Sequence, residues 1–204
     1  MSAQVLSVSL PSEIIYVSGT VNGTAYTWTL IKGAWTATVE RAADDTYAVA
    51  LTAVTAAGVS TNYTLTLYYG LLSLITDRTR ADVENETDKG FYNATDLNRV
   101  GAAVEYIAGR FTALGYACPV TVKKDWLTSD APTQRQMETY RQNIVTLRAL
   151  IAVMQSTPNA PASMAGLNYV KANDIEQILL DLDALIDKLT KSWCFSGELY
   201  AGEV

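Results

Sequence analysis

The chain contains no histidine, and this absence removes several kinds of chemistry at once. Histidine is the usual general base of serine and cysteine nucleophiles, and it is a common zinc ligand. Glycine-rich phosphate loops of the GxxxxGK or GxGxxG kind are also missing. The two cysteines, Cys118 and Cys194, lie far apart in the sequence, which favours small buried side chains over a disulfide or a metal site. We therefore expect no enzymatic activity, no cofactor and no metal ion.

One catalytic possibility survives, a pair of carboxylates of the glycosidase kind, because the chain holds 21 Asp and Glu residues. The most closely spaced set on an expected helix is Asp181, Asp183 and Asp187. Asp183 and Asp187 lie off the apolar stripe of that helix, so we expect them to face solvent. The set also lacks the glycine-turned loop that wraps a calcium ion. A solvated helix face is therefore the preferred interpretation.

Positive charge is scarce as well. The 15 Lys and Arg residues against 21 Asp and Glu give a net charge of −6, and only Lys123 and Lys124 are adjacent. Nucleic acids are bound by clustered basic residues, so no nucleic-acid partner is expected. The N-terminus does not have the pattern of a signal peptide, and the longest apolar stretch, residues 68–75, is far too short to span a membrane. The sequence therefore predicts no membrane contact and synthesis in a cytoplasm.

The first 70 residues have the pattern of β-strands. They hold only six charged residues, and apolar positions alternate with threonines in residues 26–30, 35–39 and 63–67. Branched and aromatic side chains favour the pleated surface of a sheet, and the Asn22-Gly23 pair is a hairpin turn signal. Short strands at this spacing, each with one apolar face, predict an all-β sandwich over residues 1–70.

Residues 44–67 (DDTYAVALTAVTAAGVSTNYTLTL) resemble the last two strands of bacterial immunoglobulin-like domains. The Asp-x-Tyr-x-Val pattern of those domains falls on residues 45–49, and their turn before the final strand falls on residues 56–58. The resemblance implies that Tyr47 is a tyrosine corner, whose hydroxyl bonds to backbone across the strand connection. It further implies an adhesive or spacing module without chemistry of its own. Another β meander remains an open alternative.

The second half of the chain changes to helical spacing. Apolar residues recur every three or four positions in residues 97–114, 137–154 and 175–189. Thr133 and Gln136 form a capping box before the second run, and a shorter helix is expected over residues 80–88. Residues 71–204 are thus expected to form a three-helix bundle with a short accessory helix and an extended C-terminal tail. The fold class is α+β in two domains, with the boundary between Tyr69 and Ile75.

One glycine inside the first helical run needs its own explanation. Gly101 lies beside the apolar stripe, where a helix-forming residue would be about 1 kcal/mol more favourable. We expect it to mark a place where another helix crosses closely.

Residues 75–83 (ITDRTRADV) and 89–111 (KGFYNATDLNRVGAAVEYIAGRF) resemble a helical module of tail-associated virion proteins of phages and prophages of Gram-positive bacteria. Residues 125–150, 167–185 and 196–204 fit the same module, and residues 92–99 (YNATDLNR) are its most specific part. The resemblance implies a structural or assembly component of the virion, in the tail or baseplate region. It brings no catalytic residues. Its expected partners are other virion proteins and further copies of the chain.

The aromatic residues divide into two groups. Tyr26, Trp28, Trp35 and Tyr47 occur at strand spacing, so we expect them in the sandwich core and not on a sugar-binding platform. A second group lies at segment ends, outside any stripe, where exposed aromatics often mark protein interfaces. The interface candidates are Tyr68, Tyr69, Trp193, Phe195 and Tyr200. Capping of their own domains is an equal alternative.

A second function remains open. In it the chain is a host-surface adhesin, and its immunoglobulin-like domain binds a glycan or a cell-wall polymer.

Overall fold

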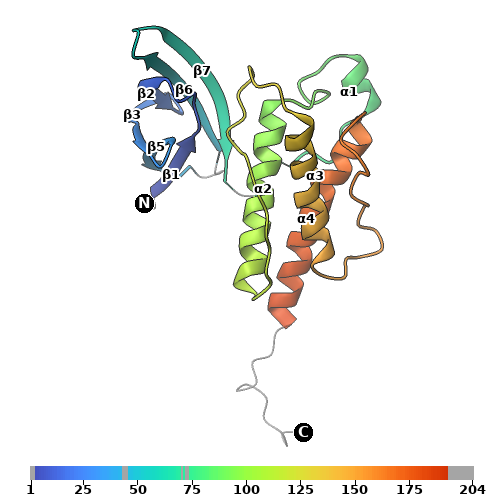
Figure 1. Cartoon of the computed structure of the whole chain (residues 1–204). Coiled ribbons are helices and arrows are strands. Elements are labelled where there is room, and N and C mark those ends of the chain that lie inside the picture. The colour runs from blue at the N-terminus through green and yellow to red at the C-terminus, as the bar shows by residue number, and fades with distance from the viewer. Residues whose placement is uncertain (1–2, 43–45, 70, 72–73, 193–204) are drawn as a thin grey trace, which may run out of the picture.

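The computed structural model describes residues 3–42, 46–69, 71 and 74–192. Two antiparallel sheets formed by the N-terminal part lie beside helices formed by the C-terminal part (Figure 1). The strands are β1 (Ala3–Val8), β2 (Ile14–Val21), β3 (Thr24–Thr27), β4 (Thr29–Ile31), β5 (Ala34–Glu40), β6 (Thr46–Thr55) and β7 (Ser60–Tyr68). The helices are α1 (Arg80–Glu84), α2 (Ala94–Ala113), α3 (Gln134–Ala149) and α4 (Tyr169–Ser192). The expected combination of β and α structure is confirmed.

The strands form one sheet of order β1-β5-β4 and a second of order β3-β2-β6-β7. The chain crosses from the second sheet to the first at Trp28, between β3 and β4. Asn22-Gly23 and Lys32-Gly33 turn with positive φ at both residues, as tight hairpins require. Alternate residues of both sheets point inward and form one apolar core, in which Trp28, Trp35 and Tyr47 are buried as expected and Tyr26 is partly buried.

Tyr47 ties the β5–β6 connection to the core. Its ring is fully buried, and its hydroxyl accepts a hydrogen bond of 3.1 Å from the backbone N–H of Ala42. The rings of Tyr47 and Tyr69 pack in a T-shaped arrangement, with 5.6 Å between their centroids. Tyr47 therefore makes the backbone bond that its place in the sequence pattern implies.

The helices pack around a second apolar core. Its buried members include Val104, Ile107 and Phe111 of α2, Ile144 and Leu147 of α3, and Ile175, Ile178, Leu179, Leu182 and Ile186 of α4. The capping box of Thr133 and Gln136 is present at the start of α3. Two helices end earlier than expected, α1 at Glu84 and α3 at Ala149. The chain after α3 folds back on this helix, where Arg148 Nε donates a hydrogen bond of 2.7 Å to the carbonyl of Pro158.

Gly101 does mark a close approach, but its neighbour is not a helix. A Cβ at this position would lie 2.8 Å from the carbonyl oxygen of Lys123 and 3.2 Å from Cγ1 of Val122. The expectation of a helix crossing was wrong, because an extended segment after α2 returns along its surface. Gly101 therefore lets the segment of residues 121–127 lie against α2.

Candidate functional site

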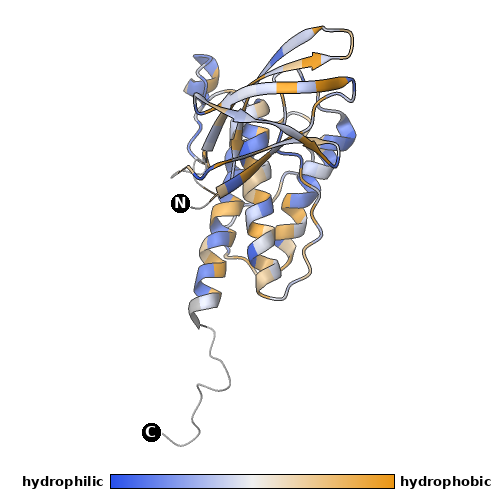
Figure 2. Cartoon of the chain, turned by 90° about the vertical axis from the view of Figure 1, so that its left-hand side faces the viewer, coloured by the Kyte–Doolittle hydropathy of each residue, from blue (hydrophilic) through white to orange (hydrophobic). Residues whose placement is uncertain are grey.

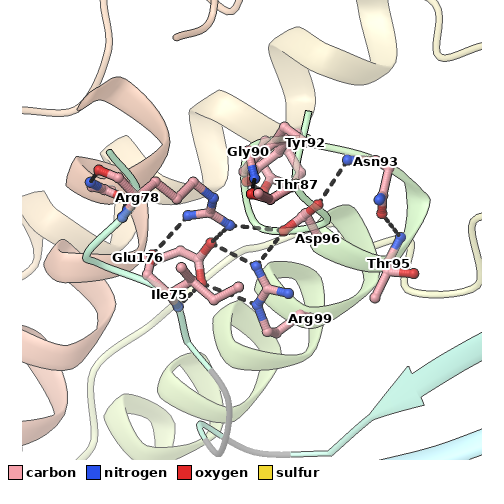
Figure 3. Close-up of polar contacts among 12 residues, drawn as sticks. Ile75, Arg78, Thr87, Gly90, Tyr92, Asn93, Thr95, Asp96, Arg99 and Glu176 are labelled. Atoms are coloured by element: carbon pink, nitrogen blue, oxygen red, sulfur yellow. Dashed lines mark hydrogen bonds and ion pairs between the residues drawn. The ribbon is translucent and has the colours of Figure 1, made fainter. Parts of the chain in front are cut away.

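Four charged side chains meet in the interior where α2, α4 and the segment before α1 come together. Arg78 Nη2 lies 2.8 Å from Asp96 Oδ1 and 2.7 Å from Glu176 Oε1. Arg99 Nη2 lies 2.5 Å from Asp96 Oδ1 and 2.9 Å from Glu176 Oε1. All four residues are at most 5% exposed, and Figure 3 shows both guanidinium groups directed at the two carboxylates. We call these four residues the charge cluster.

Local structure places each member of the charge cluster. Asp96 is the third residue of α2, where its carboxylate also accepts from the backbone N–H of the N-cap residue Asn93 at 2.8 Å. Arg99 follows one turn later on the same helix face. Glu176 reaches the cluster from α4 and accepts from the backbone N–H of Ile75 at 2.6 Å. The cluster thus joins three segments that are distant in the sequence.

The segment before α1 is fixed to α4 by further bonds. The side chain of Asn173 pairs with the backbone of Arg78, accepting from its N–H at 3.0 Å and donating to its carbonyl at 2.9 Å. Arg78 Nη1 donates to the carbonyl of Ile75 at 2.8 Å. These bonds hold residues 75–78 against α4 without regular secondary structure.

The environment of the charge cluster favours a structural role. Burial alone would lower the pKa of Arg99, but its hydrogen bonds and ion pairs with Glu176 and Asp96 raise it. Burial raises the pKa of both Tyr92 and Tyr140, whose hydroxyl groups bond to each other beside the cluster. Two positive and two negative groups balance, and neither carboxylate is accessible to a substrate. The cluster is therefore suited to fixing the fold and not to transferring protons.

A second polar group of contacts joins the sandwich to the helices. Asn98 of α2 donates from Nδ2 to the carbonyls of Thr66 at 3.2 Å and Trp126 at 3.0 Å. Its Oδ1 accepts from the backbone N–H of Trp126 at 2.6 Å. Asp125 Oδ2 accepts from the backbone N–H of Ser9 at 2.5 Å, and Leu127 is buried in the sandwich core. We call the contacts of Asn98, Asp125 and Leu127 the junction.

Asp125 is the ionisable member of the junction. Burial would raise its pKa, but the hydrogen bond and charge of Lys123 and the N–H of Ser9 outweigh that effect and lower it. The Lys123 ammonium lies 2.8 Å from Asp125 Oδ1. The carboxylate is therefore held in its charged form at the end of the sandwich.

Two cavities border α2 and the charge cluster. The first, of about 230 Å³, lies between α2, α3 and residues 121–126, and it is smaller than the roughly 300 Å³ at which ligand pockets begin. Its amide, Asn143, is already paired with the backbone of Thr121 in both directions. The second, of about 420 Å³, is lined by Arg78, Phe91 and Tyr169 among others. Nη1 and Nη2 of Arg78 are engaged by Ile75 and the charge cluster, but among the described residues its Nε has no hydrogen-bond partner, and neither has Nε1 of Trp126 at the first cavity.

Asp181, Asp183 and Asp187 of α4 bind partners within the chain. Arg110 of α2 forms ion pairs with Asp183 and Asp187, and Gln177 donates to Asp181 at 2.7 Å. The side chain of Asp187 is 51% exposed, as expected, whereas that of Asp183 is only 27% exposed. In the described part of the chain, no group of three or more His, Cys, Asp or Glu residues is placed to hold a metal ion. Among the helices described, none has the length and apolarity needed to cross a membrane.

The predicted interface residues divide between the two halves. Tyr68 is 8% exposed, and burial raises its pKa, whereas the charge of Arg99 and a hydrogen bond to it lower the pKa. Tyr69 is half-buried, with the ammonium of Lys124 4.3 Å from its ring centroid; burial raises the pKa of Tyr69 to about 12. Both contact the sandwich and the helical part, and a role toward a partner stays a prediction. Trp193, Phe195 and Tyr200 lie outside the described residues.

No sequence pattern singled out Arg78, Asp96, Arg99 and Glu176 as interacting residues. Asn98 was missed as well, because a single amide inside a helix gives no periodic signal. The available hint was that Arg99 and Glu176 each directly neighbour a position of the apolar stripe. Comparisons with protein-family models, with curated proteins and with solved structures each found no match.

Proposed function

We propose that the chain is a structural or assembly component of a bacteriophage virion, in the tail or baseplate region, and that it acts through protein–protein contacts. The observation that carries the proposal concerns residues 92–99, the most specific part of the resemblance to tail-associated virion proteins. Their polar side chains are used for construction: Asn93 caps α2, Asp96 and Arg99 build the charge cluster, and Asn98 makes the junction.

This use of residues 92–99 favours an architectural protein over an enzyme. A catalytic carboxylate must reach its substrate, whereas Asp96 and Arg99 are buried and occupied by each other and by Glu176. Asn98 is 1% exposed, and its amide is hydrogen-bonded to backbone groups of Thr66 and Trp126. The buried contacts of residues 92–99 fix the positions of the neighbouring segments, and a component of a particle needs a fixed structure of this kind.

The sandwich is proposed to be immunoglobulin-like and to form a domain of its own over residues 1–70. With β6 and β7 as the last two strands of that fold, β1-β5-β4 corresponds to the B-E-D order and β3-β2-β6-β7 to C′-C-F-G. The bond from Ala42 N–H to Tyr47 falls at the E–F connection, where the tyrosine corner belongs. These agreements support the assignment.

The proposal is tested by immunogold electron microscopy of purified particles from the host that carries the gene. Antibodies raised against the purified chain should label the tail or baseplate in most particles. Labelling that is absent from intact particles and from particles opened by mild denaturant would overturn the proposal.

A glycan-binding adhesin remains the second candidate because of Tyr16. This ring is 58% exposed on β2, opposite Val54 of β6, and Ser60 and Asn62 lie one strand farther along the same sheet face, on β7. Aromatic rings beside such groups suit a sugar. Selective binding of the full chain on a glycan array, lost in Tyr16→Ala, would favour this candidate; an empty array would remove it.

A further inference from the structure

The cavity between α2, α3 and residues 121–126 is bordered by a buried hydrogen-bond donor that lacks a partner. Trp126 is 3% exposed, and within the described part of the chain its Nε1 makes no hydrogen bond. Its backbone, by contrast, is bonded to Asn98 through both the N–H and the carbonyl. A buried donor without a partner is unfavourable, because it has lost its hydrogen bonds to water and gained none. We call this space the α2–α3 cavity.

The interior of the α2–α3 cavity is apolar and aromatic. Val104 of α2 and Tyr140 of α3 are buried there, and Val122 also lines it. The hydroxyl of Tyr140 is already bonded to Tyr92. Figure 2 shows hydrophobic and hydrophilic residues alternating along the helices below the sandwich, so a cavity between helices can combine an apolar interior with a polar opening. Its volume of about 230 Å³ exceeds the roughly 150 Å³ of an engineered apolar cavity that binds benzene, so one small ring fits.

The opening of the α2–α3 cavity lies beside the start of α3, because its exposed lining residues are Thr121, Arg135 and Gln136. Arg135 is the second residue of α3, and no carboxylate among the described residues pairs with its guanidinium. The other cation of the lining, Lys123, is held by two carboxylates, those of Asp125 and Asp130, at 2.8 and 3.5 Å.

The charge around this opening favours an anion. None of the described residues that line the cavity is acidic, although the chain has a net charge of −6. The first turn of a helix also carries partial positive charge. The exposed and unpaired side chain of Arg135 can turn toward a negative group in the cavity.

We propose that the α2–α3 cavity binds a small carboxylate with a compact apolar body, such as a single ring or a branched chain. The apolar body lies against Val104 and Val122, and the carboxylate accepts from Nε1 of Trp126 and pairs with Arg135. An inorganic anion would leave the apolar wall unfilled, and a neutral hydrocarbon would leave Nε1 unpaired. The inference does not depend on the proposed function, because binding is measured on the purified chain.

The probe is benzoate, titrated into the ¹⁵N-labelled full chain at neutral pH and followed by ¹H–¹⁵N NMR. A range up to about 10 mM covers the affinity open to a ligand of about nine non-hydrogen atoms. The chain has four tryptophans, and the indole signal that is lost in Trp126→Phe identifies Trp126. This signal should shift to saturation together with the backbone amides of residues 121–123. The indole signals of Trp28 and Trp35, which lie in the sandwich core, should stay in place.

Three comparisons test the roles assigned to the charge and to the donor. Benzamide has the shape of benzoate without its charge and should bind at least about tenfold more weakly. Arg135→Gln should weaken benzoate binding by a similar factor, whereas the matched control Arg80→Gln, an exposed arginine of α1 that does not line the cavity, should bind like wild type. Trp126→Phe keeps an aromatic ring but removes the donor, so benzoate binding, read from the amides of residues 121–123, should weaken.

The dispersion of each spectrum checks that the variants fold, and Arg135 is exposed, so its replacement leaves the cores intact. The inference is overturned if the Trp126 indole signal does not move over the whole range of benzoate, or if the shifts grow without saturating. It is equally overturned if benzamide binds as tightly as benzoate, or if Arg135→Gln binds benzoate like wild type.

Discussion

At the scale of single residues, the polar side chains that organise this chain are buried and paired within it. Asp96 lies in the first turn of α2, a place that favours a carboxylate. Its second role, binding Arg78 and Arg99, could not be predicted, since those contacts depend on how α2, α4 and residues 75–78 pack. The preference of a residue for a helix start can be predicted from a short stretch of sequence. Contacts between segments that are distant in the sequence cannot be predicted in this way.

The charge cluster predicts a large cost for removing one charge. Glu176→Gln leaves two buried guanidinium groups facing one carboxylate, so the free energy of unfolding should fall by about 3–5 kcal/mol. The matched control is Glu84→Gln, which breaks an exposed ion pair with Arg80. That change should cost at most about 1 kcal/mol. Urea denaturation measures both, and equal losses in the two variants would contradict a structural role for the cluster.

Asp125 predicts a dependence of stability on acid. Its pKa is lower in the folded chain than in the unfolded one, so the carboxylate stabilises the fold above the ordinary Asp pKa of about 3.9. This contribution is lost as the pH falls through the folded-state pKa. Asp125→Asn should therefore be less stable than wild type at neutral pH, and the difference should shrink below about pH 4. Denaturation curves across that range provide the measurement, and a difference that stays constant down to about pH 2 argues against this role.

At the scale of elements, the sequence predicted what depends on local periodicity. Alternation in residues 35–39 and 63–67 corresponds to β5 and β7, and the three helical runs correspond to α2, α3 and α4. The ends of elements were less accurate. Residues 150–154 continue the apolar spacing of α3 but lie outside the helix, and the returning chain is held to α3 by the bond from Arg148 to the carbonyl of Pro158. Gly101 likewise signalled a close contact without revealing that the neighbour is an extended segment.

Two glycines of α2 make a matched pair for testing that contact. Gly101→Ala should destabilise the chain, because the new methyl group meets the carbonyl of Lys123 and forces residues 121–127 away from α2. Gly109→Ala adds a methyl group with nothing within 4 Å, so improved helix propensity should stabilise the chain by about 0.5–1 kcal/mol. Thermal and urea denaturation of both variants decide the matter. Stabilisation of the same size at both positions would show that the close approach of residues 121–127 to Gly101 does not affect the free energy of unfolding.

At the scale of the whole molecule, the sequence separated a β-rich from a helical part but could not show how they meet. The junction uses Leu127, one apolar residue outside every predicted stripe, and Asn98, one amide within a helix. Neither has a periodic pattern. A contact between separately patterned parts leaves little trace in either pattern, which explains why the junction emerged only from the structure.

The junction makes a prediction about limited proteolysis. A cut between Tyr69 and Ile75 should give a β-rich and a helix-rich fragment by circular dichroism. The two fragments should still elute together from a size-exclusion column, because Asn98 and Leu127 lie in the helical fragment and bind the sandwich. Combining Asn98→Ala with Leu127→Ala should let them separate. Immediate separation of the wild-type fragments, or the lack of any such cut, would count against this arrangement.

The central claim, that the chain is a part of a virion, is tested most directly by quantitative mass spectrometry of particles banded on a density gradient. The account predicts that the chain co-purifies with the particles and keeps one fixed ratio to the major tail protein from fraction to fraction. The contradictory result is a chain found in the soluble lysate and missing from the banded particles.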